Sequence, residues 1–333
     1  MRIAITGEKG FIAQNLIEEI NGDNRNTEFV SLDASEYANE NMIYTINGEV
    51  CVHSNSENAW ADLFKELNID CIVHNAAVVG TDVVALNPSE SVMTNVLGTQ
   101  NITNAANQCN ILNTYIGTTV VYDTYKYQDS MIKEDSDIFP RTHYAVQKYA
   151  GEMTVRNSAK EWLVMRPLFA YGGVGDPNSL IAKSLYSAKN NKNIDMFLDP
   201  LKKKDYMHVS DFCDAVVNAI TSNVRNEDFN VSVENPYTTQ RIVEIMSETC
   251  GLDVESFLTW HSKTDYLGNH LLSCEKFSKA IGFTNAPVDI ELGIKFVWDA
   301  INNDKSKYNP LRYLEEAKDK NLDLLDFFPK SSA

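Results

Sequence analysis

The chain has 333 residues, of which 44% are hydrophobic and 23% charged, and its formal net charge at pH 7 is −17. The length suits one large α/β unit that carries a smaller second lobe. A surface this acidic repels a nucleic-acid duplex, so we expect no nucleic-acid partner, although a local basic pocket can still bind an anionic substrate. The N-terminus lacks the layout of a signal peptide and no apolar run approaches about 18 residues, so we expect a cytoplasmic protein without a membrane partner.

The cysteines and histidines give no metal signature. The six cysteines are scattered without a CxxC pair, and no HExxH spacing occurs. Reduced thiols in the core are the better interpretation, and we expect no metal.

Short apolar runs alternate with helix-like stretches through the first half of the chain. The runs expected to form strands are residues 2–6, 29–32, 70–74, 114–122 and 162–166. The stretches expected to form helices are residues 11–20, 60–67, 92–107 and 144–159. This alternation predicts an α/β fold, a Rossmann-type doubly wound parallel sheet with helices on both faces. Residues 34–52 fit less well, and we expect an extra hairpin there.

The pattern changes after Arg166, because residues 169–179 are rich in turn formers and the chain is expected to leave the sheet. A helix at 180–188, a strand at 195–198 and a basic loop at 202–204 follow. The expected units are an NAD-binding domain (1–170, with 205–235 returning to it), a smaller α+β substrate lobe (171–204 and 236–302) and a helical tail (303–333).

A glycine turn follows the first predicted strand. In residues 3–13, IAITGEKGFIA, a strand, a tight turn and a helix come in the order that a dinucleotide pyrophosphate requires. Gly7 allows the turn, Gly10 lets the backbone approach the phosphates, and the small Ala13 lets the helix pack close to the strand. The sequence therefore predicts dinucleotide binding here.

Asp33 ends the second strand-like run, about 20 residues beyond the turn. An acid at this place accepts hydrogen bonds from the adenosine ribose hydroxyls and repels a 2′-phosphate, which favours NAD over NADP. Lys9, inside the turn, could lie near a 2′-phosphate, so NADP stays as the alternative.

Tyr144 and Lys148 lie four residues apart at the start of a predicted helix, so their side chains share one face. A phenol with a pKa near 10 is a poor proton shuttle at neutral pH. An adjacent ammonium and an oxidised nicotinamide both favour the phenolate and so lower the pKa of the tyrosine. The pair predicts acid/base chemistry beside a nicotinamide.

The order of these motifs resembles that of the extended short-chain dehydrogenase/reductase family, in its nucleotide-sugar epimerase/dehydratase branch, from residue 1 to about residue 302. Besides the glycine turn, the matching segments are 70–77 (DCIVHNAA), 94–99 (TNVLGT), 117–122 (GTTVVY), 166–172 (RPLFAYG), 204–211 (KDYMHVSD), 277–283 (FSKAIGF) and 291–295 (ELGIK).

The resemblance implies a role for each candidate residue. Tyr144 is the expected general acid/base, Lys148 holds the nicotinamide ribose and lowers the tyrosine pKa, and Thr118 hydrogen-bonds the reacting sugar oxygen. The implied cofactor-binding residues are Gly7, Lys9, Gly10, Phe11, Ile12, Asp33, Ala76, Ala77, Tyr144 and Lys148. The implied substrate-binding residues are Thr118, Thr119, Tyr144, Phe169 and Lys204. Asn95, His74 and His208 are expected to be structural residues.

The sequence departs from the family pattern at several places. Phe169 stands where an asparagine is usual, which removes a polar contact to the substrate. Lys204, accompanied by Lys202 and Lys203, stands where an arginine is expected to face the diphosphate, and a lysine is a point charge where arginine is bidentate. The adenine-loop pattern is not recognisable around residues 52–54.

Thr119 and Val120 bear on the reaction. The 4,6-dehydratases of the resembled family carry an Asp-Glu pair at these places, and its 3,5-epimerase/4-reductases carry a cysteine at the second. A one-base reaction remains, so we expect an NAD-dependent nucleotide-sugar epimerase that acts through a transient 4-keto sugar. A nucleotide-sugar 4-ketoreductase that uses NAD(P)H stays open as the alternative. A 4,6-dehydratase, a reductase of a non-nucleotide carbonyl compound and a non-catalytic sensor of NAD and sugar nucleotide rank lower.

The expected small-molecule partner is a nucleotide-diphosphate sugar. In the resembled family, the helices predicted at 92–107 and 144–159 pair into a four-helix contact between subunits, so a homodimer is also expected.

Overall fold

The computed structural model describes residues 1–22, 27–38, 41–46, 49–54, 58–173, 176, 179–261, 267–284 and 286–303, and of residues 33–54 it describes the side chain of Ile46 alone. Within these residues one large sheet has the strand order β12-β7-β6-β5-β1-β2-β3-β4. Its strands are β1 (Arg2–Thr6), β2 (Glu28–Ala38), β3 (Asn41–Ile46), β4 (Glu49–Ser54), β5 (Cys71–His74), β6 (Leu112–Ile116), β7 (Trp162–Pro167) and β12 (Glu227–Val231).

The sheet is parallel from β12 to β2, and β3 and β4 extend it as an antiparallel hairpin. Alternate residues of β1 face opposite layers: Ile3 and Ile5 pack with one group of helices, and Ala4 packs with the other. Both faces of the central strands are therefore apolar, as a parallel sheet between two helical layers requires.

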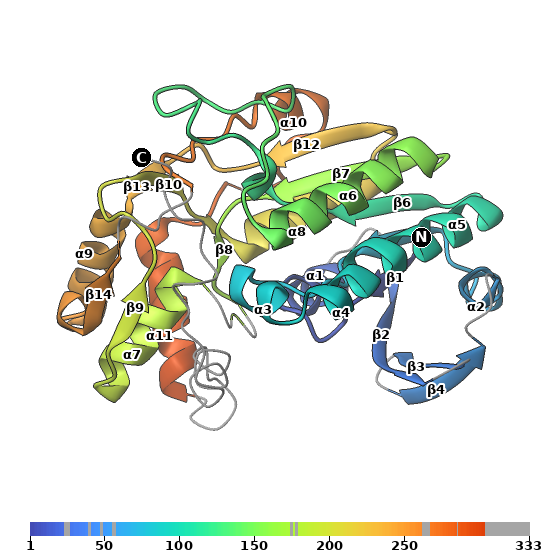
Figure 1. Ribbon diagram of the computed structural model, residues 1–333, viewed down its shortest axis with the longest axis horizontal. Coiled ribbons are helices and arrows are strands. Elements are labelled where there is room, and N and C mark those ends of the chain that lie inside the picture. Colours follow the sequence, from blue (N-terminus) through green and yellow to red (C-terminus); the bar gives the residue numbers. More distant parts are fainter. Residues whose placement is uncertain are drawn as a thin grey trace.

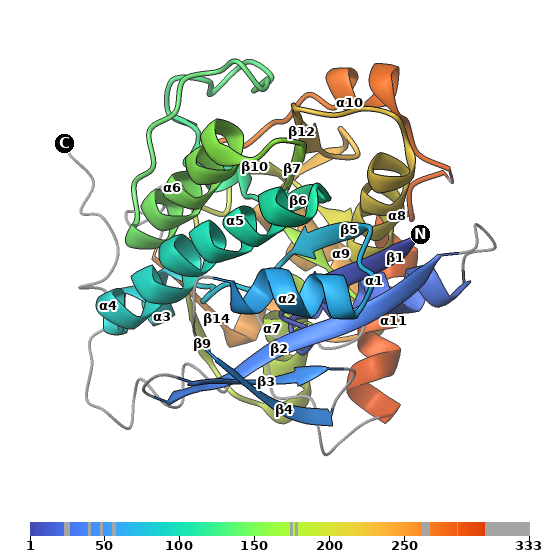
Figure 2. The same ribbon diagram turned by 90° about the vertical axis from the view of Figure 1, so that its right-hand side faces the viewer.

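Helices cover both faces of the sheet (Figures 1 and 2). One layer contains α1 (Phe11–Gly22) and α8 (Val209–Thr221), which pack against each other. The other layer contains α2 (Ala59–Glu66), α5 (Thr99–Cys109) and α6 (His143–Ser158). The short helices α3 (Thr81–Leu86) and α4 (Pro88–Val92) and a π-helical turn, η1 (Met93–Gly98), lead into α5.

A second, smaller lobe has its own apolar core (Figure 1). Its helices are α7 (Leu180–Asn190), α9 (Thr239–Cys250) and α11 (Ile290–Asn303), whereas α10 (Glu275–Ala280) lies beside β12 and packs into the core of the large sheet. Its strand pairs are β9 (Ile194–Met196) with β14 (Leu258–Trp260), β10 (Lys203–Asp205) with β13 (Pro236–Thr238), and β8 (Ala170–Tyr171) with β11 (Met207–His208). Two 3-10 turns, η2 (Thr119–Val121) and η3 (Glu255–Phe257), complete the described elements.

The structure confirms the parallel sheet, the helices on its two faces and the hairpin expected within residues 34–52. It corrects two elements. The strand expected over 114–122 ends at Ile116, because the chain turns into η2 at Thr119. The helix expected over 92–107 is interrupted by η1. Most of the expected tail, residues 304–333, lies outside the described residues.

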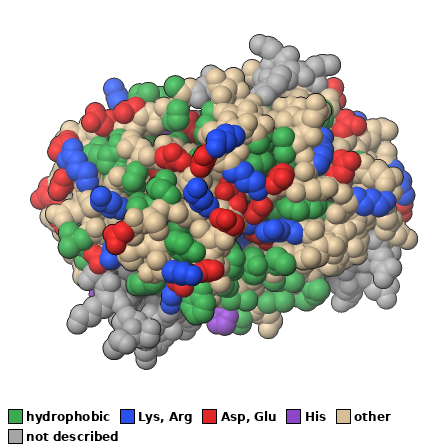
Figure 3. Space-filling view, turned by 90° about the horizontal axis from the view of Figure 1, so that it is seen from above, with side chains coloured by type: hydrophobic (Ala, Val, Ile, Leu, Met, Phe, Trp, Pro, Cys, Tyr) green, Lys and Arg blue, Asp and Glu red, His purple; other side chains and the backbone are tan. Residues whose placement is uncertain are grey.

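The described part of the chain holds no helix long and apolar enough to cross a membrane. Figure 3 shows one face of the molecule, on which basic and acidic side chains lie interspersed among hydrophobic ones. Surface ion pairs such as Lys276–Glu227 (2.7 Å) and Lys133–Glu275 (3.5 Å) reflect this mixing.

Candidate active site

The glycine turn between β1 and α1 is shaped by close backbone packing. Gly7 has a φ of +74°, and a Cβ there would lie 2.8 Å from Ala76 Cα, so a larger residue has neither the conformation nor the space. The Gly7 N–H donates to Leu32 O (2.8 Å) and the Gly10 N–H to Gly7 O (2.9 Å). The turn thus opens onto the start of α1, where free N–H groups and the helix dipole favour an anion. These residues fit a dinucleotide pyrophosphate.

A buried histidine, His74, supports the glycine turn through hydrogen bonds. The His74 ring nitrogens lie 2.8 Å from Thr6 Oγ1 and 3.1 Å from Thr99 Oγ1, and Thr6 Oγ1 also accepts from the Ala76 N–H (3.2 Å). Burial, and secondarily the charge of Lys148, lower the pKa of His74 to about 3, so the ring is neutral at physiological pH. His74 is therefore a structural residue, as the sequence predicts.

The other expected cofactor residues surround this turn. Lys9 is exposed, and its carbonyl accepts from Gln14 Nε2 (2.7 Å), while Phe11 and Ile12 are partly buried against the sheet. Ala76 and Ala77 follow β5, next to Gly7. The backbone of Asp33 lies in β2, directly after the residues that pair with β1, but its side chain is outside the described part.

Thr118 and Thr119 lie where the chain leaves β6. Thr118 caps η2 and its hydroxyl accepts from the Val120 N–H (3.4 Å); its exposed fraction is 8%. Thr119 is fully buried and donates to Pro167 O (3.3 Å), a contact that turns its hydroxyl toward the backbone of β7. Of the two, Thr118 is the one with any access to a ligand.

Tyr144 and Lys148 reach the same edge of the sheet from α6. Thr142 caps this helix by accepting from the Ala145 N–H (3.1 Å), so Tyr144 lies in the first turn, half-buried, with Lys148 one turn further on. Lys148 Nζ donates to Ile116 O (2.7 Å), and Ile116 stands two residues before Thr118. The contact brings the helix and the Thr118 segment together, as the resemblance implies.

The Lys148 ammonium is buried in a setting of low polarity. Its Nζ lies 4.2 Å from the centre of the Tyr115 ring, over the ring face. Burial lowers the pKa of Lys148 to about 7, and the negative charge of Glu152 opposes that fall. A lysine with this pKa changes charge within the physiological range.

Asn95 ties the loop after β5 to α6. Its Oδ1 accepts from the Val78 N–H (2.7 Å), and its Nδ2 donates to Val78 O (3.0 Å) and to Gln147 Oε1 (2.9 Å). All its amide contacts that are described go to the protein itself, which agrees with the structural role predicted for it.

On the side of the smaller lobe, Lys204 and Phe169 have surroundings that the sequence did not predict. Lys204 is fully buried, and its Nζ donates to Gly268 O (3.2 Å), so its charge is not on the open surface; contact with a diphosphate stays a prediction. Phe169 packs its ring 5.9 Å from that of Tyr206 and 5.8 Å, edge-on, from that of His270. His270, which has no signal in the sequence, is fully buried, and its ring has a hydrogen-bond contact with the backbone of Thr119.

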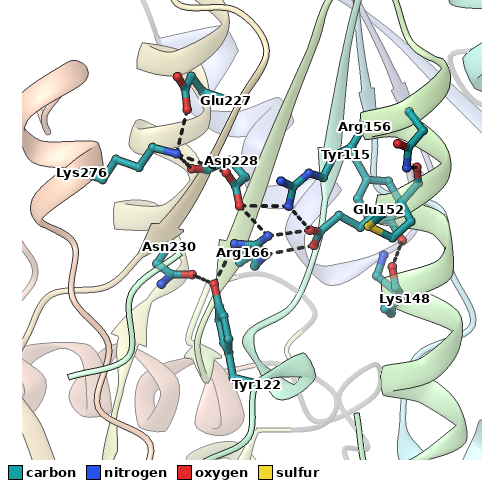
Figure 4. Close-up of polar contacts among 12 residues, drawn as sticks. Tyr115, Tyr122, Lys148, Glu152, Arg156, Arg166, Glu227, Asp228, Asn230 and Lys276 are labelled. Atoms are coloured by element: carbon teal, nitrogen blue, oxygen red, sulfur yellow. Dashed lines mark hydrogen bonds and ion pairs between the residues drawn. The ribbon is translucent and has the colours of Figure 1, made fainter. Parts of the chain in front are cut away.

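A second set of residues missed from the sequence lies behind Lys148. Three residues are buried there: Tyr115, Glu152 and Arg166. The Tyr115 hydroxyl donates to the backbone of Lys148 on α6, and Arg166 on β7 donates to Glu152 on α6 (Figure 4). The sequence signals for two of them are the position of Arg166 at the start of the matching segment 166–172 and the spacing of Glu152, which follows Lys148 by the same four residues that separate Lys148 from Tyr144. No group of three potential metal ligands occurs within the described residues.

Comparison with known proteins places the chain in a family. The profile of the NAD dependent epimerase/dehydratase family matches residues 3–232. A dTDP-glucose 4,6-dehydratase of Mycolicibacterium smegmatis is 22% identical over 334 residues, 96% of this chain and 98% of that protein. Low-salt glycan biosynthesis protein Agl12 of Haloferax volcanii is 26% identical over 262 residues, 73% of this chain and 82% of that protein.

Solved structures share the fold. MoeE5 in complex with UDP-glucose and NAD aligns with a TM-score of 0.74 at 21% identity, over 92% of this chain and 100% of that one. UDP-glucuronic acid 4-epimerase from Bacillus cereus, in complex with UDP-glucuronic acid and NAD, also aligns with a TM-score of 0.74, at 17% identity, over 91% of this chain and 99% of that one. With the family profile matching more than half of its length, the chain belongs to the NAD-dependent epimerase/dehydratase family, which confirms the α/β fold, the enzyme class and the dependence on NAD expected from the sequence.

Proposed function

We propose that the protein is an NAD-dependent nucleotide-sugar epimerase that acts through a transient 4-keto sugar. The observation that carries the proposal is the chemistry of the turn after Thr118. Thr119 is buried with its hydroxyl on Pro167 O, and Val120 has no ionisable group. Elimination of water needs a second acid/base pair beside the sugar, and this turn offers none.

The relatives include dehydratases, so the nearby carboxylates matter. Asp123 follows the turn and lies 3.0 Å from Arg141 Nη2, which holds it in an ion pair. One acid/base residue, Tyr144, and one hydrogen-bonding hydroxyl, Thr118, suffice to oxidise an alcohol and to reduce the resulting ketone again. The set supports inversion at one carbon rather than loss of water.

Each candidate residue has its own role in the proposed reaction. Tyr144 takes the proton of the sugar hydroxyl and returns it, Thr118 hydrogen-bonds the same oxygen, and Lys148 binds the nicotinamide ribose and favours the phenolate of Tyr144. Bound NAD supplies the redox chemistry. Gly7, Gly10 and the start of α1 hold the pyrophosphate, with Asp33 on the adenosine ribose.

Product analysis tests the reaction. The protein, loaded with NAD, is incubated with UDP-glucose, UDP-glucuronic acid and dTDP-glucose, and the sugars are followed by NMR. An epimerase gives a mixture of two C4 epimers with no net change in cofactor. Accumulation of a 4-keto-6-deoxy sugar would instead establish a dehydratase, and stoichiometric consumption of NADH with a keto sugar would establish the alternative ketoreductase.

The two lobes have separate tasks in this proposal. Residues 1–170 with 205–235 bind NAD, and 171–204 with 236–302 bind the sugar nucleotide. Two features support the division: β12 returns to the large sheet, and α7, α9 and α11 share the core of the smaller lobe.

We also propose that the protein forms a homodimer. Large apolar side chains are exposed on η1 and its neighbours: Val92 (40%), Met93 (57%), Leu97 (47%) and Val146 of α6 (50%). Apolar groups gathered on adjacent helices suit a helix-to-helix contact between two copies. A sedimentation mass near that of one 37.4 kDa chain at micromolar protein would count against it.

A further inference from the structure

A buried cluster of charges lies behind the candidate active site and is centred on Arg166 (Figure 4). Arg166 binds Glu152 through two bonds, Nε to Oε2 (2.9 Å) and Nη2 to Oε1 (2.5 Å). The same guanidinium donates to Asp228 Oδ2 (2.6 Å) and to the Tyr122 hydroxyl (2.7 Å). Arg166 therefore joins α6, β12 and the end of η2 to β7.

The cluster is balanced in charge. Arg156 Nη1 adds contacts to Glu152 (3.3 Å) and Asp228 (3.4 Å), and Lys276 Nζ lies 3.2 Å from Asp228 Oδ1 and 2.7 Å from Glu227. Burial alone would raise the pKa of Asp228, but Arg166, Lys276 and Arg156 hold it below its usual value. Every charge of the cluster thus has an opposite partner, which is the condition for ionised groups in the interior.

Lys148 lies one helical turn before Glu152 and has no such partner described. Its Nζ meets Ile116 O and the face of Tyr115, whose hydroxyl donates back to Lys148 O (3.1 Å). Gly151 makes this approach possible, because a Cβ there would lie 2.6 Å from Tyr115 Oη and 2.9 Å from Asn95 O. Close packing of α6 on β6 thus takes Lys148 out of water.

We propose that Glu152 is a positioning residue for the cofactor site: its carboxylate, locked by Arg166, keeps the Lys148 side chain charged and seated against β6. The proposal rests on the role given to Lys148 in the proposed function. An ammonium removed from water needs a nearby negative charge to remain protonated. Arg166 fixes the carboxylate so that it acts at a constant place and cannot fold away toward solvent.

Other titratable groups surround Lys148, and among the residues that the structure describes Glu152, one helical turn further along α6, is the group whose charge favours the ammonium. Tyr115 faces it from β6, Tyr144 lies on α6 itself, and His74 lies on β5 and is neutral. Arg166 on β7 is a cation. The carboxylates of the helices packed against α6 are Asp82 of α3 and Glu90 of α4.

A matched pair of substitutions tests the idea. Glu152→Gln and Asp228→Asn each remove one carboxylate from Arg166 while keeping the shape of the side chain, but Glu152 alone acts on Lys148. We measure, for both variants and the wild type, the melting temperature and the dissociation constant of NAD between about pH 6 and pH 9. Structural damage to the cluster lowers the melting temperature in both variants.

The expected difference is in the pH profile. NAD binding weakens as pH rises through the pKa of Lys148, and Glu152→Gln moves this fall to lower pH by about one unit, so that at high pH it binds about tenfold more weakly than Asp228→Asn. Glu152→Asp, which keeps the charge, restores most of the wild-type profile. Coincident profiles of Glu152→Gln, Asp228→Asn and wild type would overturn the proposal.

A double variant provides a second test in case the single variant misfolds. If Glu152→Gln does not fold, Glu152→Gln combined with Arg166→Gln removes both charges of the pair and leaves no unpaired ion. Its NAD profile must then shift in the same direction, and an unshifted profile refutes the proposal. Because NAD binding is measured without any sugar, a protein that shows the shift yet turns over no sugar nucleotide would sink the proposed reaction and leave this inference standing.

Discussion

The two sides of the candidate site differ in how completely their polar groups are satisfied. On the sheet side, His74, Asn95 and Lys148 each donate to or accept from a defined backbone or hydroxyl group. On the lobe side, Tyr171 Oη and His208 Nε2 are buried without a hydrogen-bond partner among the described residues.

The backbone conformation of Phe169 shows the same difference between the two sides of the candidate site. Phe169, at the start of the smaller lobe, has a φ of +36°, in the region that residues with a side chain seldom adopt. Its ring packs against Tyr206 and His270, which holds the conformation in place. Buried polar groups without partners and strained backbone gather at sites that complete themselves with a ligand. The lobe side therefore keeps a strained backbone angle and buried polar atoms without described partners, whereas the polar groups named on the sheet side are bonded within the protein.

Loss of Lys148 should break the cofactor side most severely. Lys148→Met keeps the contact with the Tyr115 ring but removes the charge, so turnover should fall by about 10²–10⁴-fold or more and NAD should bind more weakly. Steady-state kinetics and titration of nicotinamide fluorescence measure both effects. Wild-type affinity for NAD in this variant would remove Lys148 from the cofactor site.

The same variant should be more stable without cofactor. The folded-state pKa of Lys148, about 7, lies below the unfolded value of about 10.4, so folding disfavours the ammonium. This penalty is full below about pH 7 and fades toward about pH 10. The gain in melting temperature of Lys148→Met over wild type should therefore shrink as pH rises from about 7 to about 10, and a constant difference would contradict the assignment.

Tyr144→Phe should affect chemistry and spare binding. The ring stays in the first turn of α6 while the proton-transferring hydroxyl is lost, so kcat should fall by about 10²–10⁴-fold with little change in NAD affinity. The part of the pH profile of kcat that reflects titration of Tyr144 should be absent in the variant. A variant that keeps more than about a tenth of wild-type turnover would show that Tyr144 is not the acid/base.

Thr118→Val should have a smaller effect. It removes one hydrogen bond to a charge that develops on the sugar oxygen, worth about 1.5–3 kcal/mol in kcat/KM. Thr119→Val is the matched control, because the Thr119 hydroxyl already donates to Pro167 O and is fully buried. Equal losses of kcat/KM in the two variants would mean that Thr118 has no special place beside the substrate.

The smallest effect is expected on the lobe side. His270→Leu fills a similar space but loses the contact of the ring with the backbone of Thr119, so the free energy of unfolding at neutral pH should change by no more than about 1 kcal/mol. Burial, with the charge of Lys204, lowers the pKa of His270 to about 3. The stability cost of protonating it therefore appears as pH falls below about 6.5. Urea titrations should show that the variant becomes more stable relative to wild type as pH falls below about 6.5, and a difference that does not depend on pH would contradict this assignment.

Local sequence was enough to predict much of the cofactor side. The glycine turn, the β1-α1 order and the four-residue spacing of Tyr144 and Lys148 are properties of neighbouring residues, and the structure places them as expected. The errors were also local. The run after Ile116 has the composition of a strand, yet it turns into η2, because Thr119 bonds to Pro167 on the next strand and Thr118 caps the turn.

Local patterns in the sequence predicted the alternation of strands and helices and the glycine turn, and they made Tyr144 and Lys148 the catalytic candidates, because each pattern depends on residues within one turn or one strand. Only the tertiary structure decided that Lys204 is buried against Gly268, that Arg166 locks Glu152 behind Lys148, and that His270 meets Phe169. These contacts join residues up to about a hundred positions apart, and their charges and burial follow from the packing of whole elements, which no local pattern encodes.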